Sequence, residues 1–342
     1  MTQTSTSQKA VANWLLFGVF MLIIQILLGG ITRLTGSGLS ITEWDVVTGT
    51  LPPLNEIKWL EEFAKYKGTP QYQLLNTDFT LSDFKFIFFW EWFHRFIGRI
   101  IGVVFIIPFV YFLIKKQLDN ETIKKCFILL GMGAFQGFLG WFMVASGLKD
   151  MPDVSHFRLA IHLTFAFITF AYTLWVALDL IYPQKTETLY PQLKKIAQIA
   201  LIVLIIQIIW GGFVAGLNAG LVHNHWPLMS DDQFFHESIL LEQSNILKAI
   251  VEGKSGVQFF HRTFAYVVVF LMVLLYFKSK KYTLNSQQQK GIILLQIVVL
   301  LQFTLGVLTL LFHVPLWLGL AHQLVAFGLL TTMVYTLHRL SK

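Results

Sequence analysis

Four histidines lie inside long apolar segments, where a side chain that can bind a metal is unusual. They are His94, His162, His261 and His322, one in each of four segments. Each follows the start of its segment by about five to eight residues, or roughly 7–12 Å at 1.5 Å per residue of helix. If all four segments begin on the same side of a membrane, the four imidazoles lie at one level.

A small residue follows each of these histidines one helical turn later. The four small residues are Gly98, Ala166, Ala265 and Ala326. Residues four apart share a helix face, so a small residue there leaves room for a flat ligand beside the ring. Helix bundles build cofactor sites from inward side chains on facing helices. The pattern favours two haems, each with two axial histidines.

Other interpretations of these histidines compete with haem. A single intramembrane histidine more often makes a hydrogen bond between helices, but four at related positions fit that explanation less well. Copper or zinc would need three or four close ligands. A di-iron centre needs several carboxylates in the bundle, and Glu91 alone lies well inside an apolar segment. The single cysteine, Cys126, excludes a multi-cysteine metal site.

Glu91 distinguishes the first pair of histidines from the second. It lies three residues before His94 on the same helix face, whereas Gln258 occupies the matching position before His261. A carboxylate one turn from an axial ligand can take up protons, orient water or stabilise positive charge, and an amide cannot do the proton work. We therefore expect Glu91 to be catalytic. An ion pair with Arg95 is the alternative.

Arginines directly follow the first histidine of each pair. Arg95 follows His94, and Arg262 follows His261. Guanidinium pairs with carboxylates in a bidentate fork, so we expect both arginines to pair with haem propionates or with charges inside the site. The alternative is an arginine that extends to the membrane surface.

The remaining histidines give weaker signals. His223, His225 and His236 share one loop, where we expect solvated side chains, with metal binding as the alternative. We expect His156 and His338 to lie at the membrane interface. His313 precedes Val314-Pro315 and is expected to be structural, since proline cannot continue a helix.

The segments that carry these residues are long enough to span a membrane. Hydrophobic residues form 55% of the 342-residue chain and charged residues 13%, against about 25% charged in soluble domains. This composition excludes a disordered or nucleic-acid-binding chain. A transmembrane helix needs about 20 apolar residues. We predict an all-α integral membrane protein with eight such helices, at 10–32, 86–114, 126–148, 159–178, 196–222, 257–277 and the two parts of 291–337.

Charge sets the expected orientation. Short basic connections face the cytoplasm by the positive-inside rule. They carry Lys115, Lys116, Lys124, Lys125, Lys185, Lys194, Lys195, Lys278, Lys280, Lys281 and Lys290. The long loops at 33–85 and 217–256 hold most of the acidic residues and face outward. We therefore expect a bacterial inner-membrane protein with both termini in the cytoplasm and the histidines toward the outer side. The net charge of +7 records this topology.

The sequence contains an internal repeat. Four landmarks recur in the same order: Gln25–Gly30 with Gln207–Gly212, 93–95 with 260–262, Gln136–Gly140 with Gln302–Gly306, and 160–162 with 320–322. Four spans per unit give both units the same orientation, as in parallel repeats. We predict two tandem four-helix bundles, residues 1–182 and 183–342, the first with the substrate site and the second with a resident cofactor.

At these residues the chain resembles the haem A synthase family, which converts haem O to haem A for cytochrome oxidase. The most specific stretches are Gly29–Ser40, Thr42–Asp45, Leu51–Pro53, Glu91–Arg95 and Phe260–Arg262. The family oxidises the C8 methyl group of haem O to a formyl group through successive hydroxylations. The resemblance implies a substrate haem between His94 and His162, with Glu91 beside it. It also implies a resident haem b held by His261 and His322.

The resemblance also bears on partners. One subgroup of the family carries a cysteine pair in the outer loops, and this chain resembles the cysteine-free subgroup of proteobacteria and mitochondria. The expected partners are haem O, the farnesyltransferase that makes it (haem O synthase) and membrane lipid, without nucleic acid. A homo-oligomer is left open.

Two rival functions are weighed against the enzyme. A dihaem membrane cytochrome would relay electrons, for example from quinol, and would not need Glu91. A transporter would also suit parallel repeats with buried glutamines, and would bind no iron.

Overall fold

Eight long helices form the body of the molecule, described over residues 6–44, 50–148, 151–183 and 190–342 of the computed structural model. Asp45 and Lys185, which contribute to the motif and charge patterns above, lie outside the described residues. The long helices are α1 (Thr6–Leu34), α4 (Leu81–Ile114), α5 (Asn120–Val144), α6 (His156–Ile181), α7 (Pro191–Gly216), α10 (Lys254–Ser279), α11 (Ser286–Leu311) and α12 (Leu316–Ser341). Each is long and apolar enough to cross a membrane, so the prediction of an all-α membrane protein with eight spans is confirmed.

Local chemistry explains where several spans begin and end. Thr80 caps α4 through a reciprocal pair of bonds with Asp83, and Asn285 and Gln288 do the same for α11. Such boxes satisfy backbone N–H groups that have no partner inside the helix. Between α11 and α12 the chain turns at His313, whose φ is +59°. The predicted break at 313–315 is therefore confirmed.

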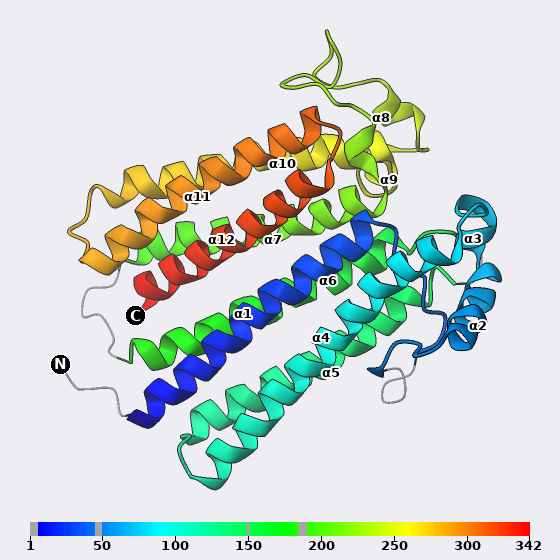
Figure 1. The fold of residues 1–342 in the computed structure, drawn as a ribbon. Helices are drawn as coiled ribbons and strands as arrows, with labels where there is room; N and C mark the ends of the chain where they lie inside the picture. The colour runs from blue at the N-terminus through cyan, green and yellow to red at the C-terminus, as the bar shows by residue number, and fades with distance from the viewer. Residues whose placement is uncertain (1–5, 45–49, 149–150, 184–189) are drawn as a thin grey trace.

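The spans are arranged as two groups of four (Figure 1). Helices α1, α4, α5 and α6 form one group, and α7, α10, α11 and α12 form the other. The groups meet where α6 packs against α7 and α12, and where α1 packs against α12. The start of α1 and the end of α12 lie at one end of the molecule. The short helices α2 (Glu56–Lys67), α3 (Pro70–Leu75), α8 (Ser238–Leu241) and α9 (Ile246–Glu252) lie at the other. This arrangement is compatible with the predicted tandem repeat.

The largest buried cluster lies along the contact between the two groups. Phe167 of α6 and Phe327 of α12 stack with ring centroids 4.3 Å apart. Gly212 of α7 lies so close to α6 that an added Cβ would be 3.0 Å from the Cα of Ala160. Close backbone approach of this kind is typical of helix contacts in membranes, where small residues allow dense packing.

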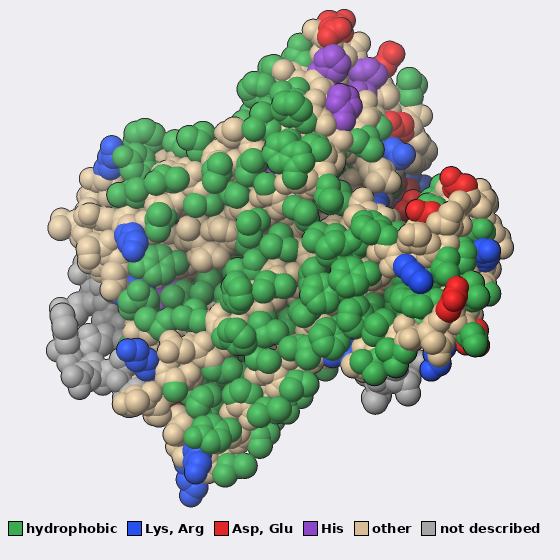
Figure 2. Space-filling view, in the orientation of Figure 1, with side chains coloured by type: hydrophobic (Ala, Val, Ile, Leu, Met, Phe, Trp, Pro, Cys, Tyr) green, Lys and Arg blue, Asp and Glu red, His purple; other side chains and the backbone are tan. Residues whose placement is uncertain are grey.

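Exposed charged side chains lie mainly toward the two ends of the bundle, and a few charged groups are buried inside it. Figure 2 shows hydrophobic side chains over the flanks of the bundle, with charged side chains toward its two ends. Asp179 is a largely buried carboxylate that binds His338 Nε2 at 3.0 Å, Lys125 Nζ at 2.7 Å, and also Lys342. His338 lies in the last turn of α12, and its side chain is fully buried, because this carboxylate partner offsets the cost of burying it. Its expected position at the membrane interface stays a prediction.

Candidate functional site

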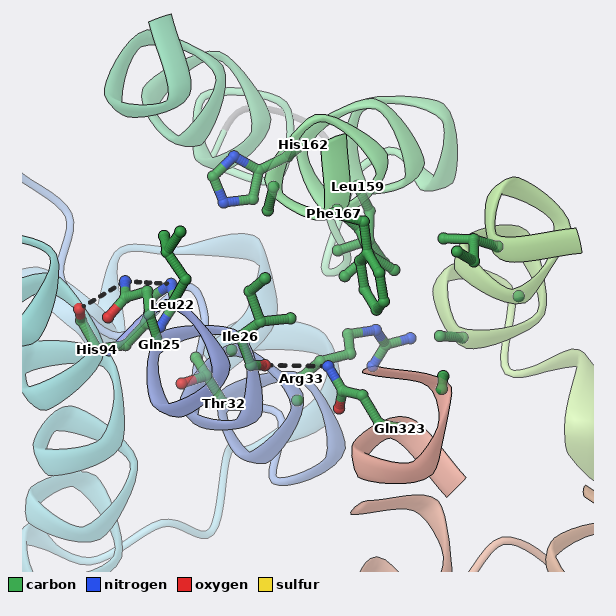
Figure 3. A pocket seen from close by; sticks show the side chains of 18 of the residues that line it. Leu22, Gln25, Ile26, Thr32, Arg33, His94, Leu159, His162, Phe167 and Gln323 are labelled. Atoms are coloured by element: carbon green, nitrogen blue, oxygen red, sulfur yellow. Dashed lines mark hydrogen bonds between the residues drawn. The ribbon is translucent and has the colours of Figure 1, made fainter. Parts of the chain in front are cut away.

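A single cavity of about 1400 Å³ contains the side chains of all four predicted histidine ligands. It is larger than the roughly 300–1,000 Å³ of an ordinary small-molecule site. Figure 3 shows His94 from α4 and His162 from α6 on facing sides of this space, with Leu22 of α1 between them in the view. His261 of α10 and His322 of α12 line the same cavity from the second group of spans. The structure thus brings together what the sequence placed on four separate segments.

Each first histidine of a pair contacts a glutamine from the preceding long helix. The Gln25 amide donates to the backbone carbonyl of His94 at 3.0 Å and lies 3.5 Å from its ring Nε2. The Gln207 amide donates to the carbonyl of His261 at 2.9 Å and lies 3.4 Å from Nε2. The two halves therefore present the same pairing.

The second histidines have the same kind of partner. Gln136 donates to the carbonyl of His162 at 3.1 Å and lies 3.2 Å from ring Nδ1. Gln302 lies 3.3 Å from Nε2 of His322. The sequence patterns marked these glutamines as landmarks of the repeat and as buried polar residues that would also suit a transporter, but not as partners of the histidines. The available signal was the Gln-x-x-x-Gly spacing, which occurs before each histidine.

The small residues one turn after the histidines also line the cavity. Gly98, Ala166, Ala265 and Ala326 all contribute to its wall. Gly98 has a second role, because a Cβ there would lie 3.2 Å from the Nε2 atom of Gln25. This glycine therefore makes room for the glutamine as well as for a ligand.

Glu91 is buried, with 3% of its surface exposed, and its carboxylate has four hydrogen-bond donors. Oε2 accepts from the backbone N–H and the hydroxyl of Ser40, both at 2.7 Å, and from the N–H of Ile41 at 2.9 Å. Oε1 pairs with Arg95 at 2.6 Å. The ion pair considered as the alternative for Glu91 is thus present, and the same carboxylate also fastens the loop after α1.

Arg95 and Arg262 each bind the loop that follows the first long helix of their half. Arg95 donates to the carbonyls of Ile41 and Glu43, and its guanidinium lies over the Trp44 ring at 4.6 Å. In the second half, Arg262 donates to three carbonyls of the loop after α7, those at 225, 227 and 228, at 2.8–3.2 Å. Both guanidinium groups line the cavity, and their pairing with propionates stays a prediction.

The three histidines of the loop after α7 differ from the expectation that all of them are solvated. His223 is partly buried and its Nε2 lies 2.9 Å from the hydroxyl of Ser255, while His236 bonds Ser238 at 2.8 Å. Burial, and next the neighbouring His236, lowers the pKa of His223 below its ordinary value. His225 is exposed, as expected. Loop packing therefore places two of the three in a hydrogen-bonded cluster.

The donor set of the cavity fits haem better than a metal ion held by protein alone. Over the part of the chain that the structure describes, no group of three or more His, Cys, Asp or Glu side chains is placed to hold a metal. A haem iron needs only two protein ligands, because the macrocycle supplies the others. Nδ1 of His94, His261 and His322 is buried without a hydrogen-bond partner among the described residues, as is Oε1 of each adjacent glutamine.

Fold and site together define a multi-pass membrane protein with paired histidines around one internal cavity. The sequence matches the family model of the cytochrome oxidase assembly proteins over residues 12–334. The chain belongs to this family, as the sequence motifs predicted.

Curated relatives match along almost their entire length. Haem A synthase of Flavobacterium psychrophilum is 68% identical over 98% of this chain and 99% of its own. Haem A synthase of Flavobacterium johnsoniae is 66% identical over 98% of both chains. Haem A synthase of Wolbachia pipientis is 41% identical over 98% of this chain and 93% of its own.

Proposed function

We propose that this chain is a haem A synthase, an oxidoreductase that converts the C8 methyl group of haem O to a formyl group by successive hydroxylations. The observation that carries the proposal is the placement of four histidines, two from each half, around one membrane-embedded cavity. Full-length relatives with this activity in their names support it. The product would serve cytochrome oxidase, in keeping with the family.

The substrate haem belongs to the first half in this proposal. Three cavity-lining glycines of the first half correspond in the repeat to bulky residues of the second: Gly102 to Val269, Gly133 to Val299 and Gly137 to Phe303. A Cβ added at any of the three glycines would meet nothing within 4 Å. Haem O carries a farnesyl chain that haem b lacks, so the roomier half suits haem O at His94 and His162. His261 and His322 then hold haem b.

Glu91 is the catalytic residue of this proposal because it lies one helical turn from His94 and has no acidic counterpart in the second half. The four donors around it hold its carboxylate in place. Oε1 and Oε2 are thus the proton-accepting atoms beside the substrate site, and Arg95 balances their charge. The apolar cavity wall limits access of water. Haem b, when bound, supplies one-electron redox chemistry.

The membrane placement follows from charge. The basic connections lie at the end of the bundle with the start of α1 and the end of α12 (Figures 1 and 2). We propose that this end faces the cytoplasm of a bacterial inner membrane and that the haem sites lie toward the outer side. The farnesyltransferase that makes haem O is the proposed supplier of substrate.

Haem extraction tests the function. The protein is purified from cells that supply haem O, and its extracted haems are separated and identified. We expect haem b together with haem O or haem A. Protohaem alone would favour an electron-relaying dihaem cytochrome, and no haem at all would favour a transporter. His261→Ala should lose haem b, whereas His225→Ala, at an exposed histidine, should retain it.

A further inference from the structure

The same histidine environment occurs four times, once in each pair of consecutive spans. Each half of the molecule therefore contains it twice. In every pair, a glutamine on the first helix faces a histidine on the second, and a glycine follows the glutamine by four residues. The four sets are Gln25, Gly29 and His94; Gln136, Gly140 and His162; Gln207, Gly211 and His261; and Gln302, Gly306 and His322. Such repetition points to a shared task.

The glutamine amide fixes the position of the histidine, along the helix axis, relative to the neighbouring span. In three of the four sets the glutamine Nε2 donates to the backbone carbonyl of the histidine itself, at 2.9–3.1 Å. A carbonyl has two lone pairs, so it can accept this bond in addition to the one inside its helix. The bond therefore fixes the backbone of the histidine relative to the neighbouring span. A small shift between the two helices would displace the imidazole.

The glycine fixes the position of the ring edge. A Cβ at Gly29 or Gly140 would lie 3.2 Å from Cε1 of the facing histidine, and the distances at Gly211 and Gly306 are 3.3 and 3.0 Å. Any larger residue would push the ring away from the neighbouring helix. Glutamine and glycine together thus form a slot on one helix that holds the imidazole of the next.

The glutamines also have hydrogen-bonding capacity that no described residue uses. Oε1 of all four is buried without a partner in the described part of the chain, and three of the facing rings have an unpartnered Nδ1. A histidine that binds a metal through one nitrogen usually donates its other ring N–H to an acceptor that sets the ring orientation. The Oε1 atom of each glutamine is a buried acceptor beside the ring, and in three of the sets the Nε2 atom of the same amide keeps its bond to the histidine carbonyl.

We propose that Gln25, Gln136, Gln207 and Gln302 are positioning residues for the four histidines. They set the position of each histidine along the helix axis and the orientation of its ring for axial ligation of haem. The inference rests on the proposed function for the identity of the ligand. It assigns the glutamines no contact with the reacting atoms. They act through the histidines.

The test compares two glutamines that make the same kind of bond. Gln207→Leu removes the amide that faces His261. Gln296→Leu is the matched control, because Gln296 of α11 donates to the backbone carbonyl of Met272 on α10 at 3.0 Å and bonds no histidine. Both variants are made in the full chain, and haem b retention, the midpoint potential and the low-spin electron paramagnetic resonance signal are measured.

We expect Gln207→Leu to weaken haem b retention about 10- to 100-fold, as is typical for partners of metal ligands, and to shift the potential and the low-spin signal. Gln296→Leu should match the unaltered protein in all three. Should Gln207→Leu not fold, Gly211→Ala decides: it keeps the amide and crowds Cε1 of His261, so the low-spin signal should change.

Three results would overturn the inference. Unchanged retention and spectra in Gln207→Leu, or in Gly211→Ala where only that variant folds, would show that the ring needs no such slot. Equal losses in Gln296→Leu would reduce the glutamines to general helix packing. An unaltered protein without haem would overturn both this inference and the proposed function, whereas a haem-loaded protein with insensitive variants would leave the proposed function standing.

Discussion

At the scale of single residues, the two matching sites differ at one position before the first histidine, which is Glu91 in the first half and Gln258 in the second. Gln258 donates one bond to the carbonyl of His223 at 3.2 Å. Glu91 instead accepts bonds from Ser40, Ile41 and Arg95. An amide in place of this carboxylate would turn an N–H toward donors, so the first half needs the acid for structure as well as for the proposed proton transfer.

Glu91→Gln should lower haem A formation by about 10²-fold or more, the usual size of a general acid–base contribution. Haem b at His261 and His322 should remain, because Ser40, Ile41 and Arg95, which bond this carboxylate, all belong to the first half. Both are measured by haem extraction from the same membranes. Glu43→Gln is the control, since Glu43 makes an exposed ion pair with Lys65 in the same outer region. Normal haem A formation in Glu91→Gln would remove Glu91 from the mechanism.

At the scale of helices, α5 and α11 have the same place in the repeat but different bulk. Gly137 directly follows Gln136, and Phe303 directly follows Gln302. Both residues line the cavity. The difference leaves space in the first half that the second half fills with an aromatic ring.

Gly137→Phe copies the second half into the first and should prevent binding of haem O while sparing haem b. The ring would occupy open space beside the first pair of histidines, because nothing lies within 4 Å of a Cβ at Gly137. The measurement is haem O and haem b per protein after loading. Gly131→Phe, also on α5 with open space but outside the cavity wall, should bind both. Full haem O binding by Gly137→Phe would place the substrate elsewhere.

The cap formed by α8 and α9 should loosen in acid. The pKa of His223 is lowered in the folded protein, first by burial and then by His236. The folded cap therefore binds fewer protons than the unfolded chain, and its stability is complete above a pH of about 6.5, the ordinary histidine pKa, and falls below it. Hydrogen exchange protection of residues 236–255 should decrease between pH 7.5 and 5.

His223→Gln should remove most of this pH dependence, because glutamine does not titrate. His225→Gln is the control at an exposed position and should keep it. A cap whose protection factors are the same at both pH values would contradict the role assigned to His223.

The features that could be predicted from the sequence are those whose signal lies within a single segment of the chain. Apolar length and periodic landmarks identified eight spans and the four histidines, since both signals lie within single segments. The environment of Glu91 was beyond such patterns, because it depends on how the loop at Ser40 folds back over α4. The burial of His338 likewise depends on Asp179, which lies 159 residues away in the sequence. Contacts between distant segments decide these features.

At the scale of the whole molecule, hydrogen bonds between the two halves lie next to both proposed haem sites. Gln323, which follows His322, donates to the carbonyl of Ile26 at 3.0 Å (Figure 3), and Ile26 follows Gln25, the partner of His94. Arg33 of α1 donates across the same boundary to the carbonyl of Gly216 at 3.2 Å. A shift of one half against the other would therefore reach ligands of both proposed haems.

Gly212→Ala tests this coupling where α7 meets α6. The added methyl would lie 3.0 Å from the backbone Cα of Ala160, so the halves must separate slightly, and overpacking of this kind costs about 1–3 kcal/mol. Gly131→Ala is the control: its Cβ meets nothing within 4 Å, and alanine is favoured over glycine in a helix by up to about 1 kcal/mol.

Thermal unfolding in detergent, followed by haem absorbance, should show a lower midpoint for Gly212→Ala and an equal or higher one for Gly131→Ala. The low-spin signals of both haems should change together in Gly212→Ala, because the boundary touches residues next to Gln25 and His322. A change confined to one haem would mean that the halves respond independently, and that the contacts at Gln323 and Arg33 hold the halves together without linking their sites.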